Sequence, residues 1–104
     1  QAVPALAAAL LHGPSEDSLA PLRKHRLATY AQLKDYGPVP MTDEEYVRKY
    51  TENTVALYQV RAAVALGAIG GPDARRALEG GLGRGDRADV QQTIRAALDQ
   101  IRKR

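Results

Sequence analysis

Few residues of this 104-residue chain have the types and spacing that catalysis or metal binding requires. The two histidines, His12 and His25, have no second histidine three or four residues away, and there is no cysteine, so no metal-ligand pattern is present. The two serines, Ser15 and Ser18, lie in an acidic, turn-like stretch where helix capping explains them, whereas a serine nucleophile would need a base beside it. We therefore expect no catalytic residue, no metal and no cofactor, and predict that the protein is not an enzyme.

Two further patterns suggest chemistry but lack its context. Asp43, Glu44 and Glu45 are consecutive, and consecutive helix residues point in different directions, so they form no acid–base pair. The glycine-rich stretch 80–85 has no preceding strand and no Lys-Ser/Thr, so it is not a phosphate-binding loop. The Arg-Gly-Asp tripeptide at 84–86 is short enough to occur by coincidence.

Arginines supply one set of candidate binding residues. The net charge of +3 is mildly basic. Arg75 and Arg76 fall on a predicted helix and Arg84 and Arg87 on the loop after it. Together they could form a basic face for nucleic acid, phosphate or an acidic peptide. A solvated helix face, with Glu79 within pairing distance of the two helical arginines, is the interpretation we favour.

Tyrosines supply the other set. All five lie between residues 30 and 58, and Tyr46 and Tyr50 are four residues apart. A tyrosine packs its ring and keeps its hydroxyl in water, so it suits both a half-buried helix edge and a protein interface. We predict that segment 30–58 contacts a partner, with Tyr46, Tyr50 and Tyr58 as contact residues.

The elements that would position these residues are all helical. The apolar residues are mainly Ala, Leu, Val and Ile, with no Phe or Trp, and no stretch alternates with the period of a strand. Breakers and caps predict helices at 3–12, 18–36, 43–69, 72–82 and 87–102.

Local signals refine two of these helices, 18–36 and 43–69. Thr42 and Glu45 form a capping box that opens the long helix. Helix propensity within it is poorest at 51–54, which is therefore where a bend or break would occur. Pro21 is expected in the first turn of its helix. Gly67 costs roughly 1 kcal/mol inside a helix, which predicts a close helix crossing there.

Two helix types recur along the chain. Residues 58–69 align without gaps onto 90–101, and 5–10 align onto 77–82. Segment 58–101 resembles HEAT repeats of the short, bacterial, phycobilisome-lyase-like type. The residues that carry the resemblance are Val60-Arg61-Ala62-Ala63, Ala65-Leu66-Gly67, Ile69-Gly70-Gly71-Pro72, Ala77-Leu78 and Leu82.

The resemblance implies a single domain, 1–104, of about five helices stacked as antiparallel pairs in a short α-solenoid, with 14–57 as a divergent repeat or an insertion. Each pair of such a solenoid buries its apolar stripe against the next, and its second helices, here with Arg75 and Arg76, line the concave face. The chain begins in what resembles a second helix, so we expect a piece of a longer solenoid or a small one capped in another way.

The implied function is a non-catalytic scaffold that binds another protein. Nucleic-acid or phosphate binding through the basic face is the alternative, and a lyase or chromophore-attachment factor follows from the family label alone. No stretch approaches the ~20 apolar residues of a membrane span. A bacterial, cytoplasmic protein is expected, and the oligomeric state stays open.

Overall fold

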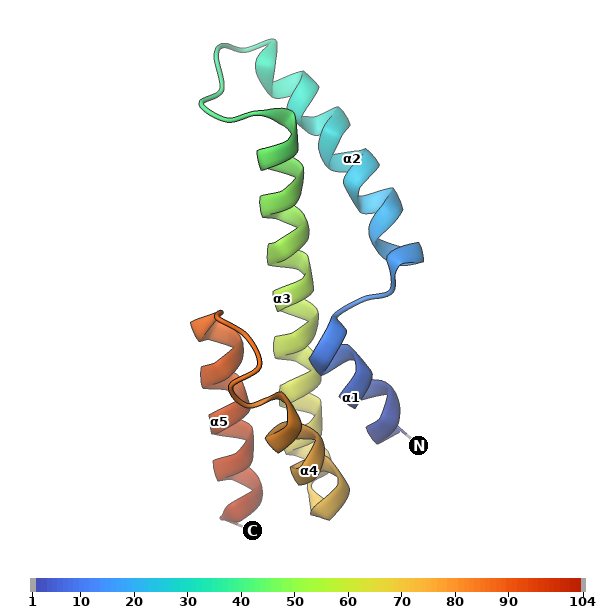
Figure 1. Ribbon diagram of the computed structural model, residues 1–104, viewed down its shortest axis with the longest axis vertical. Helices are drawn as coiled ribbons and strands as arrows, with labels where there is room; N and C mark the ends of the chain where they lie inside the picture. Colours follow the sequence, from blue (N-terminus) through green and yellow to red (C-terminus); the bar gives the residue numbers. More distant parts are fainter. Residues whose placement is uncertain (1, 104) are drawn as a thin grey trace. The chain divides into compact units, whose positions relative to one another are not determined.

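The protein is described by a computed structural model of residues 2–103, which contain five helices and no strand (Figure 1). The helices are α1 (Ala2–His12), α2 (Glu16–Lys34), α3 (Asp43–Ile69), α4 (Gly71–Gly81) and α5 (Ala88–Arg102). The all-α prediction is confirmed, and every predicted helix is present with ends that differ by two residues at most. None of these helices is long and apolar enough to cross a membrane.

The chain divides into two compact units. The first, here called the core unit, comprises residues 2–13 and 55–103, and so contains α1, the second half of α3, α4 and α5. The second, here called the hairpin unit, comprises residues 14–54, with α2 and the first half of α3. The hairpin unit lies within the segment 14–57 that departs from the repeat pattern, and its origin as a divergent repeat or an insertion stays a prediction.

Small side chains dominate the interior of the core unit. Helix α4 packs against both α1 and α5, and α5 runs antiparallel to α4 (Figure 1). Half of the fully buried cluster is alanine, which lets helix backbones approach closely. The members of the cluster are Leu10, Ala56, Ala62, Ala63, Leu66, Ala74, Leu78, Val90, Ile94 and Ala97.

The close crossing that Gly67 predicts is present between α3 and α5. A Cβ atom built on Gly67 would lie 2.9 Å from Ala97 Cβ and 3.1 Å from Ala97 Cα. A second close approach joins α4 to α1, because a Cβ on Gly81 would lie 2.9 Å from Leu10 Cδ2. Both distances are shorter than ordinary carbon contacts. The crossing of α3 and α5 requires a glycine because the Ala97 backbone lies close to Gly67, whereas the atom nearest Gly81 is the end of the Leu10 side chain.

Side-chain caps begin both helices of the hairpin unit. The Ser15 hydroxyl accepts a hydrogen bond from the Ser18 N–H at 3.4 Å, so α2 starts at Glu16. Pro21 is consequently the sixth residue of α2 and lies beyond the first turn, contrary to the sequence-based prediction. Thr42 Oγ1 accepts the Glu45 N–H and donates to the Glu45 carboxylate, both at 3.1 Å, which is the expected capping pair in a slightly different arrangement.

Helix α3 is continuous through the segment 51–54, where a bend or break was one expectation. The hydroxyl of Thr51 donates to the Val47 carbonyl at 2.7 Å, and that of Thr54 donates to the Tyr50 carbonyl at 3.0 Å. Each hydroxyl therefore shares the i−4 carbonyl of the same helix with the backbone N–H, an arrangement that keeps the threonine side chain within the helical hydrogen-bond pattern. The division between the two units nevertheless falls at this point of α3, between Thr54 and Val55.

Candidate functional site

Three tyrosines of the hairpin unit form an aromatic stack across α2 and α3. The ring centroids of Tyr30 and Tyr46 lie 4.8 Å apart, and those of Tyr46 and Tyr50 lie 4.6 Å apart, both pairs with tilted planes. Tyr30 and Tyr46 are buried, and the Tyr30 hydroxyl donates to the Met41 carbonyl, which attaches the loop between the helices to the stack. Tilted ring pairs at this separation attract one another, and this attraction adds to the stabilisation from burying their surface.

A cation lies at each end of this tyrosine stack. Lys34 Nζ is 5.0 Å from the Tyr30 ring centroid, and Arg26 Cζ is 4.4 Å from the Tyr50 ring centroid. The ammonium of Lys34 also pairs with Asp43 at 3.2 Å. Arg26 has no such carboxylate, and its Nε is a buried nitrogen without a hydrogen-bond partner, the one such side-chain atom within residues 2–103. The two ends of the stack therefore differ in charge compensation.

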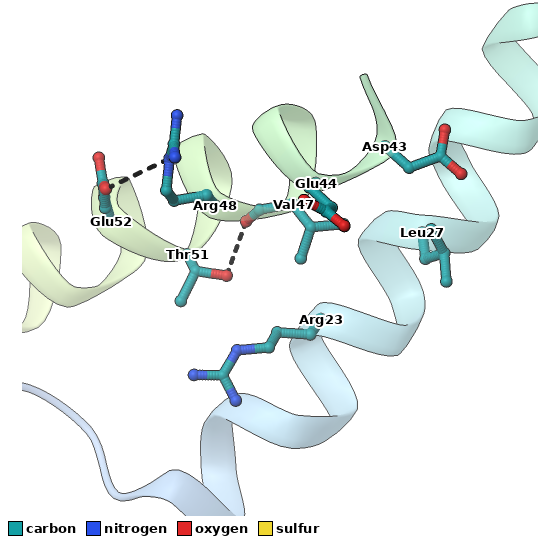
Figure 2. A pocket seen from close by; sticks show the side chains of 8 residues that line it. All are labelled: Arg23, Leu27, Asp43, Glu44, Val47, Arg48, Thr51 and Glu52. Atoms are coloured by element: carbon teal, nitrogen blue, oxygen red, sulfur yellow. Dashed lines mark hydrogen bonds and ion pairs between the residues drawn. The ribbon is translucent and has the colours of Figure 1, made fainter. Parts of the chain in front are cut away.

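The same hairpin unit has an open hollow of about 460 Å³ with an apolar floor (Figure 2). Leu27 of α2 and Val47 and Thr51 of α3 contribute the apolar atoms, and Leu27 is 47% exposed although it is a large aliphatic residue. Charged side chains stand around the hollow, contributed by Arg23, Asp43, Glu44, Arg48 and Glu52. We call this hollow the hairpin groove.

Most charges at the hairpin groove are paired with a neighbour. Arg23 forms a two-pronged contact with Glu16, with Nη2 3.2 Å from Oε2, and Arg48 Nε lies 3.9 Å from Glu52 Oε1. The hydrogen bond from Arg23 lowers the pKa of the Glu16 carboxyl below its ordinary value and the same contact raises the pKa of Arg23. Because Arg23, Asp43 and the Arg48–Glu52 pair each have a charged neighbour, the surface that remains for a partner is mainly the apolar floor.

The tyrosines predicted as contact residues occupy different places. Tyr46 is 5% exposed and supports the stack from inside, whereas Tyr50 is half-buried and carries Arg26 on its ring. Tyr58 is 43% exposed but lies in the core unit, on the second half of α3. The structure therefore brings Tyr46 and Tyr50 together with Tyr30, and it assigns Tyr58 to the other unit.

The four arginines predicted as a basic face are all exposed but are not collected in one hollow. Arg75 lines hollows beside Ile101 of α5, whereas Arg84 and Arg87 line a small one beside Leu10 and Gln91. Two of the four are paired within the unit: Arg76 with Asp73, and Arg87 with Asp89 at 3.1 Å. The hydrogen bond from Arg87 lowers the pKa of the Asp89 carboxyl.

The glycine-rich loop after α4 is held by a buried amide. The Gln91 carboxamide accepts the Gly83 N–H at 2.6 Å and donates to the Gly81 carbonyl at 3.3 Å. Gln91 is 9% exposed, so its two hydrogen bonds satisfy polar groups in a largely dry place. A structural role for the loop that carries Arg84 follows from this arrangement.

Two features of the hairpin unit were not predicted from the sequence. Arg26 interrupts the apolar stripe of α2, and this interruption is the signal that could have identified it, because a cation four residues before Tyr30 is able to reach the same aromatic face. The hairpin groove had no signal in either helix alone. Leu27 and Val47 form one surface because α2 and the first half of α3 lie side by side.

Comparison of the chain with protein-family models, with curated proteins and with solved structures finds no match. The HEAT-repeat resemblance therefore rests on the sequence pattern alone. Within the described residues there is also no group of three or more His, Asp or Glu side chains that could hold a metal ion.

Proposed function

We propose that the protein is a non-catalytic helical interaction module of the HEAT-repeat type, which binds another protein through its hairpin unit. The observation that carries this proposal is the hairpin groove. A partly exposed apolar floor surrounded by polar side chains is the usual composition of a protein-binding surface, where a hydrophobic centre is ringed by a polar rim.

A helix of the partner protein is the occupant that fits the groove. Two antiparallel helices with an apolar hollow between them can accept a third helix, which would pack its apolar face into the hollow. A small molecule fits less well, because the groove is open and most of its charged groups pair with neighbouring side chains instead of converging on its centre.

The repeat aspect of the proposal draws on the core unit. The sequence-equivalent segments 58–69 and 90–101 lie on α3 and α5, which meet at the Gly67–Ala97 crossing. The equivalent segments 5–10 and 77–82 lie on α1 and on the end of α4 with its C-cap, and α1 and α4 also pack together. Stacking of equivalent helices is the arrangement expected of consecutive repeats.

A matched pair of leucine variants tests the proposal. Leu27 and Leu33 both belong to α2 and are 47% and 43% exposed, but only Leu27 lines the groove. Immobilised wild-type protein, Leu27→Glu and Leu33→Glu are incubated with a lysate of the organism that makes the chain, and bound proteins are quantified. We expect a protein that is retained by wild type and by Leu33→Glu and lost with Leu27→Glu. Equal retention by all three, or none by wild type, would refute the proposal.

A binding site for nucleic acid or phosphate in the core unit is the second candidate. Its residues, counted as 1–13 and 55–104, include nine Lys and Arg against five Asp and Glu, a net charge of +4. This excess favours anions, whereas the pairing of Arg76 and Arg87 with nearby aspartates works against it. Binding to duplex DNA that falls steeply between low and physiological salt would support this candidate, and undetectable binding at low salt would remove it.

A further inference from the structure

We propose that Arg26 binds a single carboxylate, an Asp or Glu side chain of the partner protein. This inference rests on the proposed function, because it specifies the chemistry of the partner that the hairpin unit binds. It starts from the unequal ends of the tyrosine stack, where Lys34 has Asp43 as its counterion and Arg26 has none among residues 2–103.

The position of Arg26 leaves one edge of its guanidinium for a ligand. One face of the group lies on the Tyr50 ring, 4.4 Å from the centroid. Nε is buried without a partner, and neither Nη nitrogen is buried and unsatisfied within the described residues. The Nη edge is therefore the part that solvent reaches. Two parallel N–H groups in one plane match the two oxygens of a carboxylate.

Half-burial makes this arginine a stronger anion receptor than an arginine in water. Arg26 has already lost part of its hydration on folding, and the tyrosine ring restricts its orientation. A carboxylate that binds it consequently pays little to order the side chain and interacts through a medium less polar than water. The other arginines of the hairpin unit, Arg23 and Arg48, already contact the glutamates Glu16 and Glu52.

The charge of the hairpin unit favours one carboxylate over a polyanion. Residues 14–54 include six Lys and Arg against seven Asp and Glu, a net charge of −1. Nucleic acid would need several uncompensated cations along its backbone. A single acidic side chain on an otherwise neutral protein surface needs one.

Acetate serves as the probe for this site. In heteronuclear NMR of the full chain at constant ionic strength, acetate is expected to shift the Arg26 Nε–Hε signal and the Tyr50 amide saturably at concentrations up to about 0.1 M, the weak range of a single contact. Chloride should not. In Arg26→Gln, and in Arg26→Lys, which keeps the charge and loses the fork, the Tyr50 response should weaken about tenfold.

Lys49→Gln is the matched control, because Lys49 is an exposed cation one residue before Tyr50 and has no place in the tyrosine stack. It should respond to acetate as wild type does. The proposal is wrong if acetate produces no saturable shift or if Lys49→Gln weakens the response as much as Arg26→Gln. It is also wrong if inorganic phosphate saturates the site at a lower concentration than acetate does. Leu27→Glu is expected to leave the acetate response intact, so failure of the Arg26 site and failure of the groove are seen separately.

Discussion

Replacement of Gly67 by alanine is expected to destabilise the core unit, although alanine is the better helix former. The new methyl carbon would lie 2.9 Å from Ala97 Cβ, 3.1 Å from Ala97 Cα and 3.1 Å from Gln100 Oε1. The carboxamide of Gln100 can rotate away, but a backbone Cα cannot, so α5 must move outward from α3. Overpacking of this kind costs about 1–3 kcal/mol.

The opposing gain from helix propensity is about 0.5–1 kcal/mol, so the net loss of unfolding free energy should be about 1–2 kcal/mol. Gly80→Ala is the matched control, because Gly80 lies near the end of α4 and a Cβ there meets no atom within 4 Å. That variant should be as stable as wild type or up to about 1 kcal/mol more stable.

Urea unfolding followed by far-UV circular dichroism measures both variants, and the chain has no tryptophan to report by fluorescence. The Gly67→Ala midpoint should fall below wild type, and the Gly80→Ala midpoint should not. If Gly67→Ala were as stable as Gly80→Ala, the close crossing of α3 and α5 would not exist in solution.

Three further substitutions test local statements about the fold. Pro21→Ala should raise the unfolding free energy by about 1–2 kcal/mol in urea titrations, because it restores a backbone N–H inside α2, and a decrease would contradict the placement of Pro21 beyond the first turn. Glu16→Gln should lower stability above pH 4.5, the ordinary pKa of this carboxyl. Its lowered folded-state pKa means that Glu16 stabilises the fold fully above that pH and loses this effect as the pH falls through the folded-state value; a stability difference from wild type that stays constant on acidification would refute the Arg23 contact. Gln91→Leu should cost about 1 kcal/mol and speed amide exchange in the loop between α4 and α5, whereas unchanged exchange there would show that the carboxamide does not hold the loop.

Local signals predicted the helices well because capping and close packing are encoded within a few residues. Thr42 and Glu45 identify the start of α3 from their spacing alone, and Gly67 in the apolar stretch 62–69 predicts the crossing with α5. The start of α2 was placed two residues too late because the stretch 13–17 was interpreted as a turn, although Ser15 in it is a capping residue. The hydroxyl of Ser15, which precedes Glu16 and Asp17, is the one that caps.

The candidate site was only partly predictable, because its residues come from two helices. The spacing of Tyr46 and Tyr50 places them on one face, but their contact with Tyr30 and Arg26 depends on how α2 packs against α3. The groove depends on the same packing, since Leu27 and Val47 are unremarkable within their own helices. A pattern read along one helix carries no information on the rotation of its neighbour.

The most direct test of the central claim is the affinity of the hairpin unit's partner for the matched leucine variants. With the retained protein purified, calorimetry gives its dissociation constant for wild type, Leu27→Glu and Leu33→Glu. Burying the exposed half of a leucine contributes about 1 kcal/mol, and a buried unpaired carboxylate adds a further penalty, so Leu27→Glu should weaken binding by at least about tenfold. Leu33→Glu should bind as wild type does. Equal dissociation constants for the two variants would contradict the claim that the hairpin groove is the binding surface.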